Sequence, residues 1–187
     1  MKKSKPIGSK KRLASKIYSF IGDDGFTRTL HGCTLSKDHC LIEVHGDIDA
    51  LQSMIDKLIA YAKYSDSMAE QKPLLLKVQL LLWQLGGELS QKKVGGLVTK
   101  PIGESDVVDL EKTIDSFELD LHEFQRFNNL IAIDVNETRI RTRKLERTLT
   151  EYLKKSKIRP EVYKYINRLS DYFFALAVKI QQEERDI

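Results

Sequence analysis

The chain has 187 residues, of which 41% are hydrophobic and 31% are charged, and it contains only 4 Pro and 10 Gly. This composition favours a soluble helical protein with one core and argues against a β-sandwich or a disordered chain. The formal net charge of +4 derives partly from a cluster of Lys and Arg within residues 1–12. Because no basic stripe continues beyond that cluster, we interpret residues 1–12 as a disordered tail, not as a nucleic-acid or membrane contact, and residues 13–187 as one domain.

Targeting and metal signals are missing from the sequence. No apolar segment of the secretory type follows the first lysines, and the longest apolar runs are interrupted by Lys77, Gln79 and Gln84, so we expect a cytoplasmic protein without a membrane span. Cys33 and Cys40 lack the paired spacing of a zinc site and are expected to be reduced thiols. The four histidines show no ligand spacing, so neither a protein-bound transition metal nor hydrolase chemistry is predicted.

The sequence pattern changes near Asp47 from that of a loop to that of a helix. Residues 13–40 are rich in Gly, Asp, Ser and Thr and show no sustained period, which predicts a structured loop. From Asp47 to about Ala62, apolar residues recur at helical spacing, with Asp47 or Asp49 near the N-cap. This pattern predicts the first helix.

A second helix is predicted from about Pro73, a residue favoured in the first helical turn, through Leu89. It has two apolar stripes, and two stripes need two partners, one inside the subunit and one across an oligomer interface. A helix wholly buried inside a monomer would give the same pattern. The first stripe is Leu74, Leu75, Val78, Leu81, Leu82, Leu85 and Leu89, and the second is Leu76, Leu80 and Trp83.

The remaining elements are also helical. Residues 91–104 contain three glycines and Pro101 and predict a loop. Helices are predicted at 106–117 and 132–154, and Pro160 opens a last helix whose apolar residues stand at near-heptad spacing. Nothing in the sequence indicates a sheet. The predicted fold class is therefore all-α, an antiparallel bundle of four or five helices.

The first candidate site lies on the predicted helix at 132–154. Arg139, Arg143 and Glu146 stand at i, i+4 and i+7 and therefore project from one face. Two guanidinium groups on one stripe suit a clamp on phosphate oxygens, and the carboxylate one turn on suits an arginine or a ribose hydroxyl. The same spacing is typical of a solvated charged face held by ion pairs, so spacing alone leaves the choice open.

Two further segments carry candidate sites. In the last predicted helix, Asn167 and Asp171 form a polar pair away from the apolar stripe, which indicates a contact with another helix or with a ligand. The segment Gly22–Thr27 is a glycine-spaced turn ahead of Lys37. Its backbone N–H groups can approach an anion that the lysine neutralises, although it does not match the P-loop pattern.

Taken together, these segments resemble the ATP:cob(I)alamin adenosyltransferases of the propanediol-utilisation type, a family that includes the human mitochondrial enzyme. The three segments together indicate this family more specifically than any one of them does. The matching stretches are the loop at 18–27, Lys37 and Asp38, residues 43–53, the stripe of Arg139, Arg143, Lys144, Glu146 and Arg147, and residues 165–173.

The resemblance implies transfer of the 5′-deoxyadenosyl group of ATP to cob(I)alamin, with release of triphosphate. It implies a homotrimer with its sites between subunits, ATP with Mg²⁺ and reduced cobalamin as ligands, and a reductase and an adenosylcobalamin-dependent enzyme as partners. It assigns catalytic roles to Arg143, Arg139 and Asp49, with Asp49 and Arg139 paired across the interface. It assigns binding roles to Gly22, Asp23, Gly25, Thr27, Lys37, Glu146, Asn167 and Phe124, the last on the lower face of the corrinoid.

Several positions depart from the family's nucleotide loop. Ile21 stands where a threonine is expected, Ser19 and Phe20 stand where basic and hydroxyl residues are usual, and Gln52 stands where an asparagine is expected. The altered loop at 19–21 favours an alternative function, in which a non-catalytic homologue binds ATP or a corrinoid as a sensor or chaperone. A plain helical interaction module is a third hypothesis, and it requires the three segments to agree by accident.

Overall fold

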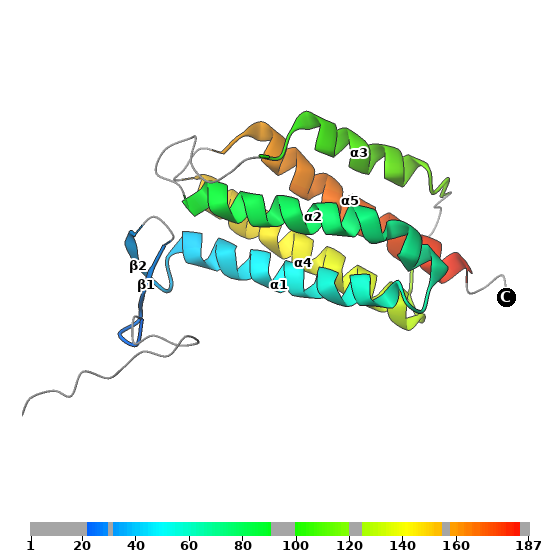
Figure 1. Cartoon of the computed structure of the whole chain (residues 1–187), viewed down its shortest axis with the longest axis horizontal. Coiled ribbons are helices and arrows are strands. Elements are labelled where there is room, and N and C mark those ends of the chain that lie inside the picture. Colours follow the sequence, from blue (N-terminus) through cyan, green and yellow to red (C-terminus); the bar gives the residue numbers. More distant parts are fainter. Residues whose placement is uncertain (1–21, 30–31, 91–99, 120–124, 155–157, 184–187) are drawn as a thin grey trace, which may run out of the picture.

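The computed structural model describes residues 22–29, 32–90, 100–119, 125–154 and 158–183. Successive helices in these ranges run in alternating directions along one bundle (Figure 1). This arrangement confirms the predicted all-α bundle, with a small hairpin added at one end. The elements are β1 (Phe26–Arg28), β2 (Thr34–Ser36), α1 (Cys40–Tyr61), α2 (Asp66–Ser90), α3 (Glu104–Asp115), α4 (Leu130–Leu153) and α5 (Pro160–Glu183).

The start of α1 lies at Cys40, so the start predicted at Asp47 was wrong. The backbone of His39 is extended, and its imidazole Nδ1 accepts a hydrogen bond from the Leu41 N–H at 3.1 Å. His39 therefore caps the helix in the way that Ser or Asp usually does, and a histidine cap gives little sequence signal. Asp47 lies within α1, where it contacts α4.

The start of α2 lies at Asp66, and Pro73 is inside the helix, so the predicted start was wrong here too. Ser65 caps α2, because its hydroxyl oxygen accepts from the Met68 N–H at 3.3 Å and its carbonyl accepts from the Ala69 N–H at 2.9 Å. Pro73 and Ala69 are both exposed. Water can therefore solvate the carbonyl oxygen that loses its partner to the proline ring.

The hairpin corrects the expectation that the chain contains no sheet. β1 and β2 pair in antiparallel register, with Thr27 opposite Leu35. Strands of three residues are too short to produce a recognisable period in the sequence. The hairpin extends beyond the N-terminal end of α1, at one end of the bundle (Figure 1).

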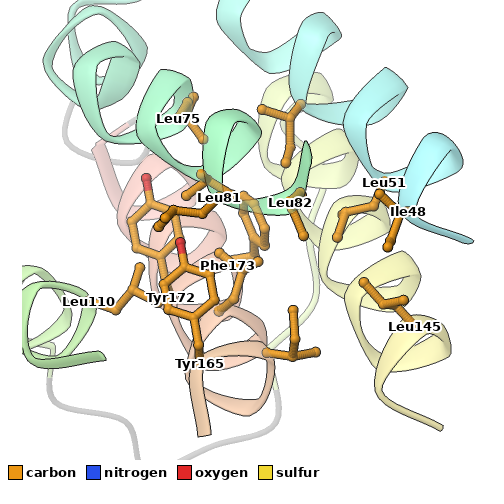
Figure 2. Packing of buried hydrophobic residues seen from close by; sticks show 14 of the residues in the cluster. Ile48, Leu51, Leu75, Leu81, Leu82, Leu110, Leu145, Tyr165, Tyr172 and Phe173 are labelled. Atoms are coloured by element: carbon orange, nitrogen blue, oxygen red, sulfur yellow. The ribbon is translucent and has the colours of Figure 1, made fainter. Parts of the chain in front are cut away.

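The centre of the core is formed by three large aromatic residues of α5. Tyr165, Tyr172 and Phe173 are almost completely buried, and Figure 2 shows them beside leucines from α2 and Leu110 from α3. The Tyr172 hydroxyl donates to the Gln71 carboxamide oxygen of α2 at 3.2 Å. Burial raises the pKa of both tyrosine hydroxyls above the usual range, so both stay neutral.

The two stripes of α2 have different environments. All but one residue of the first stripe are buried in the bundle, and Leu74 is half-buried. In the second stripe, Leu76 is 48% exposed, Leu80 is 47% exposed and Trp83 is 63% exposed. The reading of α2 as a helix wholly buried inside a monomer is therefore wrong.

Some predicted features fall outside the described residues. These are the tail at 1–12, most of the predicted loop at 91–104, and Phe124. Among the described helices, none is long and apolar enough to cross a membrane.

Candidate functional site

The glycine-spaced turn and Lys37 converge, as the sequence predicted. Gly22 and Gly25 both have positive φ, 101° and 85°, which glycine adopts at little cost. The Lys37 N–H donates to the Gly25 carbonyl at 2.9 Å. A Cβ placed on Gly22 would lie 3.6 Å from the Lys37 Nζ and only 2.8 Å from the Phe26 carbonyl oxygen. The lysine ammonium therefore lies beside a turn that only glycine fits.

The neighbouring predicted residues lie on the same hairpin. Asp23 is exposed beside Gly22, and Thr27 is half-buried in the middle of β1. Thr27 lines a pocket of about 580 Å³ between the hairpin, α1 and the last turns of α2, with Trp83, Gly86 and His45 among its other walls. The turn therefore borders a cavity large enough for part of a small ligand.

His45 lines this pocket from α1. Its Nε2 lies 2.9 Å from the Ser90 hydroxyl, in hydrogen-bond contact. Burial lowers the pKa of the imidazole, and the negative charge of Asp49 opposes that shift without reversing it. His45 is therefore neutral near pH 7.

The second half of the site lies on α4 and α5, where three contacts join the two helices. The Arg139 guanidinium carbon is 5.8 Å from the centroid of the Phe174 ring. Two turns further along α4, the Asn167 amide donates to the Glu146 carboxylate at 3.0 Å. One turn further, the hydroxyls of Thr150 and Tyr163 are 3.2 Å apart. We call the surface formed by these six residues and Arg143 the α4–α5 face.

Arg139 and Arg143 lie close enough to affect each other. Partial burial lowers the pKa of the Arg139 guanidinium, and the positive charge of Arg143 lowers it further. Arg139 Nε donates to the Asn136 carboxamide oxygen at 2.8 Å, which fixes its side chain without neutralising it. Arg143 is exposed. Within the described residues neither guanidinium forms an ion pair, in contrast to Lys144, which binds Asp47 at 2.7 Å.

The polar residues Asn167 and Asp171 have different partners. Asn167 contacts Glu146 of α4, whereas Asp171 binds Arg168 of its own helix at 2.6 Å. Asp49 is exposed on α1 and, among the residues that the structure describes, forms no ion pair. The pairing of Asp49 with Arg139 between subunits therefore stays a prediction.

Sequence reasoning missed Asp47 and Tyr163. Asp47 is 5% exposed, and it receives the Lys144 ammonium and the Thr148 hydroxyl of α4, at 2.7 and 2.6 Å. A charge this buried requires such partners, but an Asp near an expected helix start resembles an ordinary cap. Tyr163 is four residues before Asn167, so helical periodicity was the signal that could have placed it on the α4–α5 face.

The two halves of the site do not meet within one chain. The described residues of the turn and hairpin share no hydrogen bond or ion pair with α4 or α5, and the hairpin extends away from the bundle (Figure 1). Nor do the described residues contain a cluster of three or more His, Cys, Asp or Glu suited to a metal ion. Within the described residues, the turn with Lys37 and the α4–α5 face are therefore two separate candidate surfaces.

Comparison with known proteins decides the family. A family model described as cobalamin adenosyltransferase matches residues 17–180. The chain belongs to the cobalamin adenosyltransferase family. Within this family, a corrinoid adenosyltransferase of Citrobacter freundii is 33% identical, over 92% of this chain and 98% of the relative. One of Bacillus subtilis strain 168 is 32% identical, over 87% of this chain and 84% of the relative.

The family fold is also found in solved structures. A variant of the PduO-type ATP:corrinoid adenosyltransferase from Lactobacillus reuteri, complexed with cobalamin and ATP, superimposes with a TM-score of 0.79 at 26% identity. That match covers 91% of this chain and 93% of the relative. The part of this chain that matches the cobalamin adenosyltransferase model contains both the Gly22–Lys37 turn and the α4–α5 face.

Proposed function

We propose that this protein is an ATP:cob(I)alamin adenosyltransferase. In the reaction, an electron pair of Co(I) attacks C5′ of the ATP ribose, the C5′–O bond breaks, and triphosphate leaves with the bonding electrons. A Co–C bond forms, and the cobalt becomes formally Co(III) in adenosylcobalamin. Because cobalamin supplies the nucleophile, the protein's tasks are binding, orientation and stabilisation of the leaving group. Family membership and the relative solved with cobalamin and ATP support this assignment.

The observation that carries the proposal is the unneutralised charge of Arg139 and Arg143. Burial lowers the pKa of Arg139, and the nearby positive charge of Arg143 lowers it further. An anion between the two guanidinium groups removes the cost of their repulsion. Guanidinium groups bind phosphate oxygens with two parallel hydrogen bonds. The leaving triphosphate is such an anion, so the pair acts most strongly where negative charge develops during bond cleavage.

The turn supplies the other side of the triphosphate site. The backbone N–H groups from Gly22 to Gly25, the Thr27 hydroxyl and the Lys37 ammonium are donors that suit phosphate oxygens. Mg²⁺ is held readily by phosphates with one or two carboxylates, and Asp23 within this turn offers an exposed carboxylate. This mode of binding requires no metal cluster built from protein side chains alone.

The ribose is assigned to Glu146 and Asn167. Their mutual hydrogen bond uses one carboxylate oxygen and the amide nitrogen, which leaves the Glu146 Oε2 and the Asn167 Oδ1 as acceptors for ribose hydroxyl groups. The pair is one turn from Arg143 along α4. If the triphosphate binds the two arginines, the Glu146–Asn167 pair therefore lies beside the ribose.

A homotrimer completes the site in this proposal. The second stripe of α2, formed by Leu76, Leu80 and Trp83, is an exposed apolar surface. Burial of this surface against a second copy of the chain would be favourable. Assembly would bring the turn of one subunit to the α4–α5 face of the next, with Asp49 and Arg139 paired across the interface. Phe124 would close the lower face of the corrinoid.

The chemistry also specifies what must surround the enzyme. A reductase must supply Co(I), and an adenosylcobalamin-dependent enzyme must use the product. The cytoplasm, which provides ATP and reducing agents, is the proposed compartment.

The direct test is anaerobic incubation of the protein with ATP and chemically reduced cobalamin. Adenosylcobalamin should form, and the phosphate product should be intact triphosphate in equal amount. Tight ATP binding without adenosylcobalamin formation would instead identify the non-catalytic homologue. ATP hydrolysis to diphosphate would contradict the mechanism.

A further inference from the structure

Tyr163 extends the α4–α5 face by one turn beyond the proposed ribose site. It lies on α5 four residues before Asn167, and Thr150 lies on α4 four residues after Glu146. Residues four apart share one face of a helix. The Thr150–Tyr163 contact at 3.2 Å and the Glu146–Asn167 contact at 3.0 Å are therefore successive contacts between the same two helices.

The Tyr163 ring is held in place and is accessible. The Tyr163 hydroxyl lies 3.2 Å from the Thr150 hydroxyl, in hydrogen-bond contact, and the Thr150 hydroxyl also donates to the Glu146 carbonyl at 2.7 Å. This bond fixes the end of the ring. The tyrosine is nevertheless 38% exposed and takes no part in the buried core. A fixed, exposed aromatic ring is a stacking surface rather than a packing residue.

The order of groups along the α4–α5 face matches the order of groups in a nucleoside triphosphate. Arg139 and Arg143 are suited to phosphates, and Glu146 with Asn167 is suited to ribose hydroxyls. The Tyr163 ring follows one helical turn later, about 5.4 Å along the axis. The base is joined directly to the ribose, so the group that follows the ribose is the base.

We infer that Tyr163 stacks against the nucleobase of the bound nucleotide, with Thr150 as the residue that positions its ring. This inference rests on the proposed function, because it takes the triphosphate and ribose positions from that proposal. Aromatic stacking accepts any base because every base has a π-face. Tyr163 therefore contributes affinity for the nucleoside part of ATP and not for the triphosphate.

The test compares ATP with inorganic triphosphate, which lacks both ribose and base. Calorimetry on the full chain should show that Tyr163→Ala weakens ATP binding about tenfold, as expected for one lost stacking contact, and leaves triphosphate binding unchanged. Tyr163→Phe keeps the ring but removes the hydroxyl that contacts Thr150, so it should lose clearly less ATP affinity than Tyr163→Ala. A structural role alone would not separate the two ligands in this way.

Tyr64 offers a matched control, since it is 81% exposed on the connection between α1 and α2. Tyr64→Ala should leave both affinities unchanged. The inference is overturned if Tyr163→Ala binds ATP like the wild type, if it loses ATP and triphosphate equally, or if it changes the oligomeric state in place of ATP affinity. If the wild type itself binds no ATP, the proposed function fails together with the inference.

Discussion

The amide of Asn167 on α5 donates to the carboxylate of Glu146 on α4 across 3.0 Å. The contact lies on the exposed surface where α4 and α5 meet, and not in the core. An exposed contact of this kind adds only about 0–1 kcal/mol to stability. In the proposed function, its position one turn from Arg143 places it beside the nucleoside of ATP.

We expect Asn167→Ala to lower kcat/KM for ATP by about 10- to 100-fold, which corresponds to losing a hydrogen bond next to a charged group. The melting temperature should change little, because the side chain is exposed. Lys164→Ala is the matched control, since Lys164 is also exposed on α5 and pairs with Glu104 away from the face. Equal activity in both variants would remove Asn167 from the site.

The proposed homotrimer is tested by Leu80→Glu in the second stripe of α2. A charge at the centre of a buried apolar interface is costly, so sedimentation should show a shift from trimer to smaller species, with a parallel loss of turnover. Far-UV circular dichroism should stay helical, because Leu80 is 47% exposed in the single chain. Tyr64→Glu should leave the assembly intact. A wild type that sediments as a monomer, or a Leu80→Glu protein that stays trimeric and active, would contradict this part of the proposal.

His45 predicts how stability depends on pH. Burial places the pKa of the folded-state imidazole below the ordinary histidine value of 6.5, so the unfolded chain binds a proton more readily than the folded one. The contribution of neutral His45 to the free energy of unfolding is fully present above pH 6.5. It is lost as the pH falls through 6.5 toward the lower folded-state pKa. Denaturant titrations should show the wild type losing stability relative to His45→Gln in that window. Parallel pH profiles for the two proteins would contradict the assignment.

Gln181 should be important for stability and not for catalysis. This α5 residue is 2% exposed, and its carboxamide oxygen accepts from the backbone N–H groups of Asn128 and Asn129 at 2.7 and 3.1 Å. Gln181→Leu leaves both donors without that acceptor and should lower the free energy of unfolding by about 1–3 kcal/mol. The neighbouring Gln182→Leu should change it far less. Similar losses in both variants would show that the hydrogen bonds contribute little.

The helices and the arginine stripe could be predicted from sequence because both depend on local periodicity. Spacing placed Arg139, Arg143 and Glu146 on one face, and the structure confirms that arrangement. The predicted starts of α1 and α2 were wrong. A histidine cap such as His39 gives little sequence signal, and Pro73 was taken as the first turn of α2 in place of Ser65, an ordinary N-cap residue. The contacts of Asp47 with Lys144 and Thr148 depend on how α1 packs on α4, which no local pattern specifies. For the same reason, the separation of the turn from the α4–α5 face emerged only in three dimensions.

The most direct measurement for the central claim is the turnover of Arg143→Ala beside that of Arg141→Ala, with ATP and chemically reduced cobalamin. Both arginines are exposed on α4, but Arg141 forms an ion pair with Glu137 at 3.1 Å, whereas Arg143 is proposed to bind the leaving triphosphate. Arg143→Ala should lower kcat by about 100- to 1,000-fold without loss of helical content, as expected for one lost donor to a developing charge. Arg141→Ala should keep nearly full activity. Wild-type turnover in Arg143→Ala would contradict the proposed role of the arginine pair.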